Sequence, residues 1–134
     1  MNTRITRTIA TVALAATPTL GVLSFADSAS AKGREVIRTG RCSNGASWKL
    51  KAKAEDGGLL DVEFEVDANR NRQRWSVAIN DNGVRVFTGV RFTHAPSGSF
   101  SVERLIADRA GVDHITATAV RTATGATCRA ALDF

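Results

Sequence analysis

The 134-residue sequence contains no tyrosine, a single methionine, and only two residues each of proline, histidine and cysteine. It has no internal repeat and no low-complexity tract, and beyond residue 31 no segment carries apolar residues at helical spacing. Without that spacing, a helical bundle or a parallel α/β domain is excluded as the fold class. Two histidines and two cysteines provide few candidate ligands for a metal ion and few candidate nucleophiles.

The two histidines, His94 and His114, give no sign of a catalytic site. Neither lies in a recognisable nucleophile motif, and the G-x-S-x-G pattern is absent. Asp113 directly precedes His114, so in an extended strand the two side chains would point to opposite faces. We therefore expect no enzyme and no catalytic residue, with a triad assembled from distant segments as the alternative.

The run Asp-Ala-Asn-Arg-Asn at 67–71 begins like the calcium loop of an EF-hand. That pattern then requires a glycine at its sixth position and a glutamate at its twelfth, but Arg72 and Ala78 stand there. Asp67 and the two asparagines are therefore interpreted as turn formers. No metal and no cofactor is expected.

The N-terminus has the composition of a signal peptide. Two arginines precede an apolar stretch at 9–25, which ends near the small-residue sequence Ala29-Ser30-Ala31. The alternative is an uncleaved membrane anchor, but the apolar stretch is short for a span and is broken by Pro18. We predict a signal peptide over 1–31 and a secreted, extracellular domain over 32–134, with no transmembrane anchor after processing.

Two cysteines in a secreted chain predict one disulfide, between Cys42 and Cys128. Such a bridge closes a loop over most of the domain and stabilises it by about 4–5 kcal/mol in the chain-entropy treatment. A zinc site completed by His94 and His114 is the alternative, but no C-x-x-C or H-x-x-x-H spacing supports it.

From residue 33 onward, apolar and polar residues alternate in short runs that are separated by glycine- and asparagine-containing turns. Seven clear strands and one weak first strand are expected, over 33–42, 47–55, 60–67, 74–80, 84–92, 99–106, 115–120 and 128–134. This spacing predicts an all-β fold, a single antiparallel β-sandwich of seven to eight strands.

Lysines alternate with apolar residues in 47–55, and acidic residues alternate with apolar residues in 60–67. A three-residue loop at 56–58 sets the register of this hairpin by parity, because opposed residues point to the same side. The expected pairs are Lys49 with Glu65, Lys51 with Glu63, Lys53 with Asp61, Trp48 with Val66 and Leu50 with Phe64. The lysine row is therefore expected to be a neutralised, solvated face and not a ligand site.

The segment 73–92 is predicted to form a second hairpin around Asn82-Gly83, which supplies the positive φ angles of a two-residue turn. A regular register from this turn pairs Trp75 with Val90 on the core side. On the outer side it pairs Ala78 with Phe87 and Arg74 with Arg91.

The outer face so predicted carries arginines and an exposed aromatic ring but no carboxylate. Facing arginines are mildly destabilising unless an anion lies between them, and an aromatic ring nearby can stack on a sugar or a base. The candidate ligand-binding residues are Arg70, Arg72, Arg74, Arg85, Phe87 and Arg91. Alternatively, the arginines splay into water and the terminal segment covers Phe87.

Two features resemble the immunoglobulin-like sandwich: Trp75, one strand before an Asn-Gly turn, and the run 107–117, which is similar to the Asp-x-Ala-Gly corner of that family. The chain departs from the family in having Ala117 near the position of the family's cysteine, and in a bridge that ties first strand to last. The pattern of cysteine, Trp-Lys-Leu-Lys, Asn-Gly and Pro-Ser-Gly-Ser-Phe also resembles small secreted actinobacterial proteins of unassigned function. These resemblances imply a fold and a compartment but no catalytic residues.

The expected function is that of a secreted, non-catalytic binding module for an anionic polysaccharide or another polyanion, outside the cell or at the cell wall. The alternative is a secreted inhibitor or effector that acts on another protein through the turn at 95–98 or the connection at 68–72. Exposed strand edges would also allow a protein partner to add a strand.

Overall fold

The computed structural model describes residues 33–134, and the expected signal peptide over 1–31 lies outside these residues. Eight strands follow one another in the described chain. They are β1 (Glu35–Arg41), β2 (Ser47–Glu55), β3 (Leu59–Asp67), β4 (Arg74–Asp81), β5 (Val84–Phe92), β6 (Ser99–Ala107), β7 (His114–Arg121) and β8 (Thr127–Asp133). No helix within residues 33–134 is long and apolar enough to cross a membrane.

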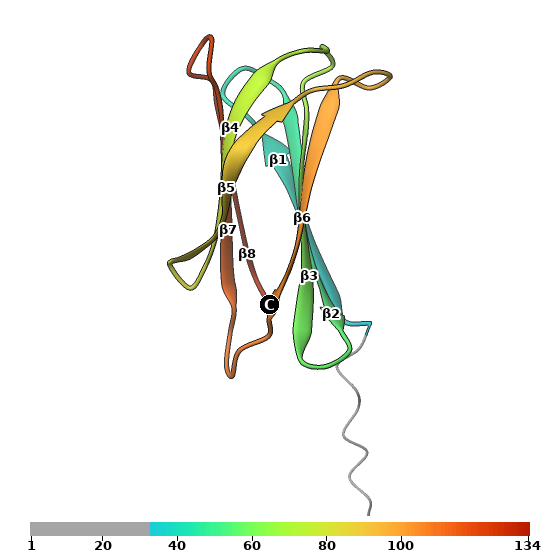
Figure 1. Ribbon diagram of the computed structural model, residues 1–134, viewed down its shortest axis with the longest axis vertical. Coiled ribbons are helices and arrows are strands. Elements are labelled where there is room, and N and C mark those ends of the chain that lie inside the picture. The colour runs from blue at the N-terminus through green and yellow to red at the C-terminus, as the bar shows by residue number, and fades with distance from the viewer. Residues whose placement is uncertain (1–32) are drawn as a thin grey trace, which may run out of the picture.

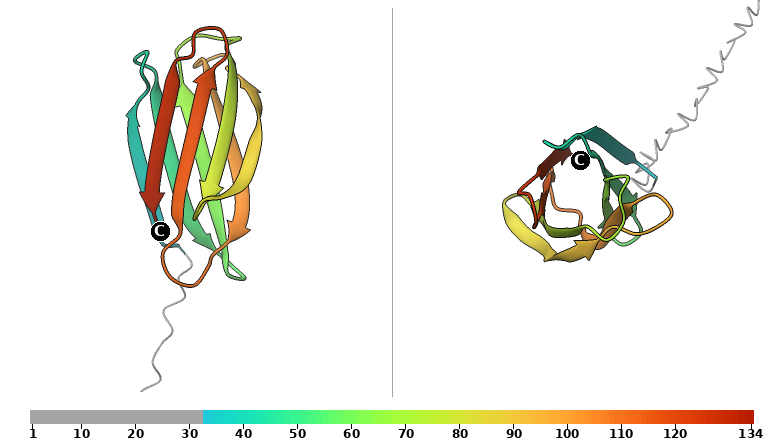
Figure 2. Two further views of the ribbon diagram at one scale, coloured as in Figure 1. Left: turned by 90° about the vertical axis from the view of Figure 1, so that its left-hand side faces the viewer. Right: turned by 90° about the horizontal axis from the view of Figure 1, so that it is seen from above.

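The strands form two four-stranded sheets in the orders β1-β2-β3-β6 and β5-β4-β7-β8, and every pairing is antiparallel. The two sheets face each other, which confirms the predicted all-β sandwich (Figure 1). At the two open sides of the sandwich, β1 lies beside β8 and β5 lies beside β6 (Figure 2). The first strand is an edge strand, as expected.

The inward-facing residues of the alternating strands fill the space between the sheets. Trp75, Phe64 and Leu50 have no exposed surface. The Trp75 ring lies 6.2 Å from that of Phe100, and its Nε1 donates a hydrogen bond to Oε1 of Gln73 at 3.3 Å. Burying a side chain of this size is a large part of what stabilises a sandwich.

The predicted register of the β2–β3 hairpin is confirmed at every pair, including Lys51 opposite Glu63 and Trp48 opposite Val66. Lys51 Nζ lies 2.6 Å from a Glu63 carboxylate oxygen, and Lys49 Nζ lies 3.6 Å from the carboxylates of Glu63 and Glu65. The hydrogen bond between Lys51 and Glu63 raises the pKa of the lysine and lowers the pKa of the glutamate. The lysine row is therefore neutralised within its own sheet.

The predicted register of the β4–β5 hairpin is wrong beyond its first two pairs. Asn80 pairs with Arg85 as expected, but a bulge between Ile79 and Asn80 then shifts the ladder by one residue. Ile79 consequently pairs with Phe87, and Trp75 with Arg91. A bulge of this kind turns all later side chains of the strand to the opposite face.

The bulge overturns the expected exposed face of arginines and Phe87. Phe87 is only 6% exposed and belongs to the core. Arg91, on β5, and Arg104, on β6, stack on its ring, with guanidinium carbons 4.9 Å and 4.7 Å from the ring centroid. Both arginines occupy inward-facing ladder positions on edge strands, an arrangement that discourages strand addition at that side of the sandwich.

Replacing Phe87 tests the shifted register directly. We expect Phe87→Ala to lower the free energy of unfolding by about 3 kcal/mol, because it removes a buried aromatic ring. The matched variant Phe92→Ala, at a position that is 47% exposed on the same strand, is expected to change it by less than about 1 kcal/mol. Chemical denaturation measures both, and the reverse order of effects would restore the regular register.

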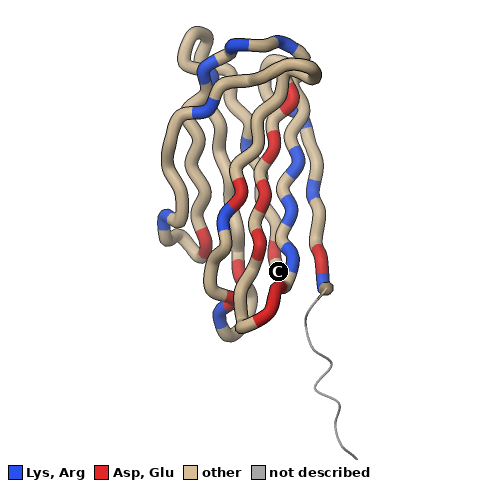
Figure 3. Tube along the Cα trace, turned by 45° about the vertical axis from the view of Figure 1, so that its right-hand side comes forward, with Lys and Arg blue, Asp and Glu red and all other residues tan. Residues whose placement is uncertain are grey.

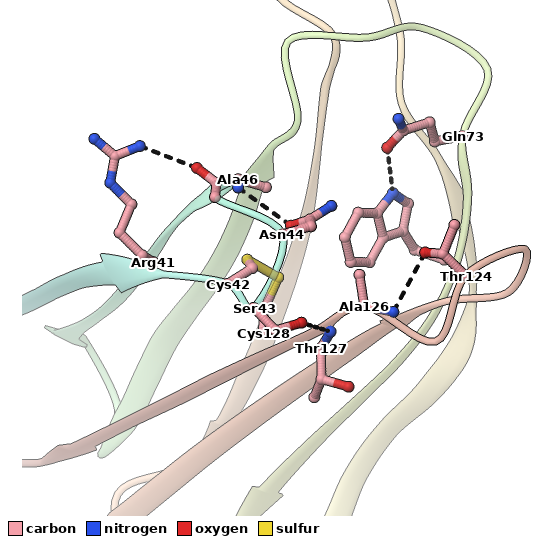
Figure 4. The surroundings of a disulfide bond; sticks show 12 residues. Arg41, Cys42, Ser43, Asn44, Ala46, Gln73, Thr124, Ala126, Thr127 and Cys128 are labelled. Carbon is pink, nitrogen blue, oxygen red and sulfur yellow. Dashed lines mark hydrogen bonds between the residues drawn. A yellow bond between two sulfur atoms is a disulfide. The ribbon is translucent and has the colours of Figure 1, made fainter.

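The predicted disulfide between Cys42 and Cys128 is confirmed, with a sequence separation of 86 residues. It ties the turn after β1 to β8, and Figure 4 shows the bridge with its surroundings. The backbone N–H of Ser43 donates to the Thr127 carbonyl at 2.9 Å, and Thr127 N–H donates to the Ser43 hydroxyl at 2.9 Å. This cross-link joins the two sheets at one end, and it fits an extracellular protein.

Candidate anion-binding site

Charge is separated along the long axis of the molecule. Strands β1, β3, β5 and β7 all end at the same end, which we call the basic end. In residues 33–134 this end, taken as the loops and the three nearest residues of each strand, carries two carboxylates, Glu65 and Asp67, and eight basic side chains, namely Arg41, Lys49, Arg70, Arg72, Arg74, Arg91, Arg121 and Arg129. Figure 3 shows blue segments gathered around the loops at the end away from the C-terminus.

The opposite end, which we call the acidic end, has the reverse balance. Its carboxylates in the described chain are Glu35, Glu55, Asp56, Asp61, Asp81, Asp108, Asp113 and Asp133, against Arg34, Lys53, Arg85 and Arg109. The molecule is therefore an electrostatic dipole, which would orient an anionic partner toward the basic end.

A polar hollow of about 580 Å³ opens at the basic end. Its walls are the β1–β2 turn, the β3–β4 connection and the end of β7. It is lined by Arg41, Asn44, Gly45, Ala46, Ser47, Asp67, Ala68, Asn69, Arg70, Gln73 and Arg121. Three arginines thus face one hollow from three separate parts of the chain.

The β3–β4 wall of the hollow is held in place by the β5–β6 loop. Gly98 has a φ of +72°, and a Cβ atom there would lie 2.2 Å from the backbone nitrogen of Arg70. The Ala68 N–H donates to the Gly98 carbonyl at 3.0 Å. Asp67 accepts a hydrogen bond from the Asn69 N–H at 2.9 Å, which is the turn-forming role expected for it.

The β1–β2 wall is equally well braced. The Cys42 N–H donates to the Ala46 carbonyl at 2.7 Å, and the Asn44 side chain accepts from the Ala46 N–H at 3.2 Å. Arg41 Nη1 donates to the Gly45 carbonyl at 3.0 Å, so its guanidinium lies along the turn (Figure 4). Because the disulfide anchors this turn, the backbone that carries Arg41 needs little further ordering to meet a ligand.

The arginines of the hollow are not neutralised by the rest of the domain. None of Arg41, Arg70 and Arg121 makes an ion pair with a carboxylate of residues 33–134. The Nε atom of Arg121 is buried and has no hydrogen-bond partner within the described residues. The charges of the three arginines are therefore not offset by an ion pair within the described residues and remain available to an anion in the hollow.

The structure separates the ligand-binding residues predicted from sequence. Arg70 lines the hollow, and Arg72 and Arg74 lie at the same end; Arg74 Nη1 donates to the Thr122 hydroxyl at 3.1 Å. Arg85 lies at the acidic end, where its Nε donates to Asn80 at 2.7 Å. Phe87 and Arg91 belong to the stack between β5 and β6 described above.

Arg41 and Arg121 were missed by the sequence interpretation. The available signal was their position at the ends of the first and seventh strands, since alternate strands of an antiparallel chain end on the same side. The two histidines lie at opposite ends, with His114 paired to Asp133 at the acidic end and His94 in the β5–β6 loop. They therefore cannot act together on one small substrate.

Comparisons with protein-family models, with curated proteins and with solved structures found no match to this chain. The chemistry of the hollow must therefore be inferred from its own side chains.

Proposed function

We propose that this protein is a non-catalytic binding module whose basic end holds an anionic polymer outside the cell. One observation carries the proposal: Arg41, Arg70 and Arg121 line a single hollow, and none of them makes an ion pair with a carboxylate of residues 33–134. Guanidinium groups bind sulfate, phosphate and carboxylate through paired, charge-assisted hydrogen bonds.

A polymer fits this end better than an isolated ion. Arg72 and Arg74 are exposed at the start of β4, next to the hollow, so the positive surface extends beyond the rim of the hollow. A chain of regularly spaced anions can meet both the hollow and this extension. The carboxylates of the acidic end would repel the same polymer, so that binding occurs in one orientation.

The compartment and the fold family are part of the proposal. The disulfide fits an extracellular protein, and the signal peptide expected over 1–31 would direct secretion. Membership of the immunoglobulin-like fold family is supported by the strand order of the two sheets. Strands β2, β3 and β6 of the first sheet, leaving out the edge strand β1, face the second sheet β5-β4-β7-β8, and Trp75 lies on β4. In that family the corresponding strands are A-B-E and C′-C-F-G, with the core tryptophan on C.

The alternative of a loop-based inhibitor or effector has one observation in its favour. The connection at 68–72 and the exposed turn at 95–98 are locked together by the Gly98 contact and by Thr93, whose hydroxyl accepts from the Gln73 N–H at 2.9 Å. A rigid exposed loop loses little entropy on docking. A protease panel without inhibition at micromolar concentration would remove the protease version of this alternative.

The double substitution Arg41→Glu with Arg70→Glu tests the proposal. Both side chains are exposed, so the fold should be retained. We expect wild-type protein to bind a sulfated glycan and polyphosphate with an affinity that falls as salt rises, and the variant to bind at least about tenfold more weakly because two charge-assisted contacts become repulsive. Isothermal titration calorimetry at two salt concentrations measures both effects.

The matched control is Arg85→Glu with Arg129→Glu, which changes the net charge by the same amount at exposed positions outside the hollow. This control should weaken binding only slightly. Equal losses in the two variants would show that overall charge, and not the hollow, holds the polymer. Absence of binding by the wild-type protein would contradict the proposed function.

A further inference from the structure

The outward-facing sides of the two sheets differ in charge. On β2 and β3, nearly every outward position is a lysine or a carboxylate (Figure 3). The sheet β5-β4-β7-β8 faces the viewer in Figure 2 (left), and its outward positions carry Arg74, Arg85, Arg129, Asp133 and the ionisable His114. Each of these five residues lies on an edge strand or is the first residue of β4 or β7, so the centre of this face is uncharged.

The centre of this outer face is also partly apolar. Ser76 pairs with Val90 on one side and with Val120 on the other, and the two valines are 37% and 36% exposed. Phe92 follows on the same side of β5 and is 47% exposed. The other central positions are Ala78, Thr88, Thr116 and Thr118. An uncharged, partly apolar centre with charges at its margin is typical of a protein–protein interface.

A two-fold axis parallel to the strands, running between β4 and β7, would make this face self-complementary. It lays β5 of one copy over β8 of its partner, and β4 over β7. Two neighbouring rows of residues cross the sheet in register, namely Arg85, Asn80, Thr116, Ala131 and Thr88, Ala78, Thr118, Arg129. The axis therefore brings Arg85 toward the partner's Ala131, and Arg129 toward the partner's Thr88.

The surface opposite Arg85 matches it in shape and in charge. A hollow of about 340 Å³ on β7 and β8 is lined by Thr116, Ala117, Thr118, Arg129, Ala130 and Ala131, which leaves room for a long side chain. Arg85 makes no ion pair with a carboxylate of residues 33–134. Asp133, two residues beyond Ala131 on the same side of β8, offers one.

The other simple arrangement of two copies fits less well. A two-fold axis perpendicular to the strands would lay β8 over its own copy and bring the two Arg129 side chains close together, which is unfavourable. It would also move Asp133 away from the partner's Arg85, because the two residues lie at the same end of the molecule. The distribution of charge therefore favours the axis parallel to the strands.

The area of the face suits a dimer that can dissociate. Four strands of about eight residues, at roughly 4.8 Å between strands and 3.4 Å per residue, give a flat projection of roughly 500 Å². A standard interface buries about 800 Å² of accessible surface per partner, and most non-specific crystal contacts bury less than about 400 Å². The projection falls between these two values even before the relief of the side chains is counted.

We propose that the outer face of β5-β4-β7-β8 joins two copies of this chain in a parallel, two-fold dimer. Val90 and Val120 form its centre, and Arg85 pairs with the partner's Asp133 on each side. The inference does not rest on the proposed function, because the hollow at the basic end lies outside this face. Association can therefore be measured without any polyanion.

The test is sedimentation equilibrium over a range of about 1–500 µM. We expect wild-type protein to pass from monomer to dimer in this range. Val90→Lys with Val120→Lys places charges at the centre of the face and should weaken association at least about tenfold. The matched control, Ile37→Lys with Leu105→Lys, adds the same charge at exposed apolar positions of the other sheet and should leave association unchanged. Circular dichroism and urea midpoints establish that both variants fold.

A charge exchange tests the orientation of the two copies. Asp133→Arg places a like charge opposite the partner's Arg85 and should weaken association. Arg85→Asp together with Asp133→Arg restores opposite charges at this contact, so association should return most of the way to the wild-type value. A double variant as weak as Asp133→Arg alone would overturn the axis parallel to the strands.

The remaining outcomes concern the face itself. Wild-type protein that stays monomeric at every concentration would overturn the dimer and leave the face to a different partner or to solvent, while the anion-binding proposal would stand. Equal weakening by the two lysine pairs would show that added charge, and not this face, controls association. Conversely, a protein that dimerises but binds no polyanion would retain this inference and lose the proposed function.

Discussion

Replacing both Cys42 and Cys128 with serine is expected to lower the free energy of unfolding by about 4–5 kcal/mol. The bridge spans 86 residues of sequence, so its loss gives the unfolded chain a large gain in conformational entropy. A domain of this size is typically stable by only about 5–15 kcal/mol. The double variant should therefore be marginally folded, with a much lower denaturation midpoint in urea.

The double substitution is preferred to a single one because a lone cysteine would leave a reactive thiol. Ser43→Ala is the matched control, since it removes only the exposed hydroxyl that accepts from Thr127 N–H and should cost about 1 kcal/mol. The bridge also anchors the turn that carries Arg41, so polyanion binding should weaken in the double variant under conditions where it stays folded. A loss below about 1 kcal/mol would mean that the oxidised chain gains little from the cross-link.

Trp75→Ala is expected to cost about 3–5 kcal/mol. The side chain is completely buried between the sheets, and its removal leaves a cavity and an unpaired Gln73 Oε1. Denaturant titration followed by circular dichroism measures the change. Ser76→Ala, on the outer face of the same strand, should alter stability by less than about 0.5 kcal/mol.

Trp75→Phe separates packing from hydrogen bonding at this position. It keeps most of the apolar ring but loses the bond to Gln73, which lines the anion hollow. We expect a smaller destabilisation than for alanine, together with a measurable weakening of polyanion binding. Equal destabilisation by phenylalanine and alanine would mean that the hydrogen bond, and not the volume of the ring, is the main contribution.

The two hairpins explain why one register could be predicted and the other could not. In β2–β3, the lysines and carboxylates alternate strictly and the glycine loop has only one length that pairs them, so local pattern and turn agree. In β4–β5, the Asn-Gly turn predicts the first two pairs correctly. Val86 and Phe87 are adjacent and both apolar, so the alternation of apolar and polar residues does not reveal which of the two faces the core. The bulge turns Phe87 toward the core, where Arg104 of β6 stacks on its ring.

The candidate site divides in the same way. Arg70, Arg72 and Arg74 are close in sequence and were found from their spacing. Arg41 and Arg121 come from strands that belong to different sheets, and no local pattern joins them to Arg70. Alternation predicts Trp48 on the core side of its strand, and its half-buried indole packs there against the core and over Gly40 of the neighbouring strand.

The sequence by itself determined the strands, the turns and the neutralised lysine row, because each depends on the spacing of residues along the chain. It also determined the disulfide, because each of the two cysteines has only the other as a partner. The tertiary structure alone decided which arginines meet and where Phe87 lies. Those features depend on contacts between strands far apart in the chain, where a shift of one residue exchanges the buried and exposed faces. Of the three arginines that carry the proposed function, Arg41 and Arg121 belong to this second group.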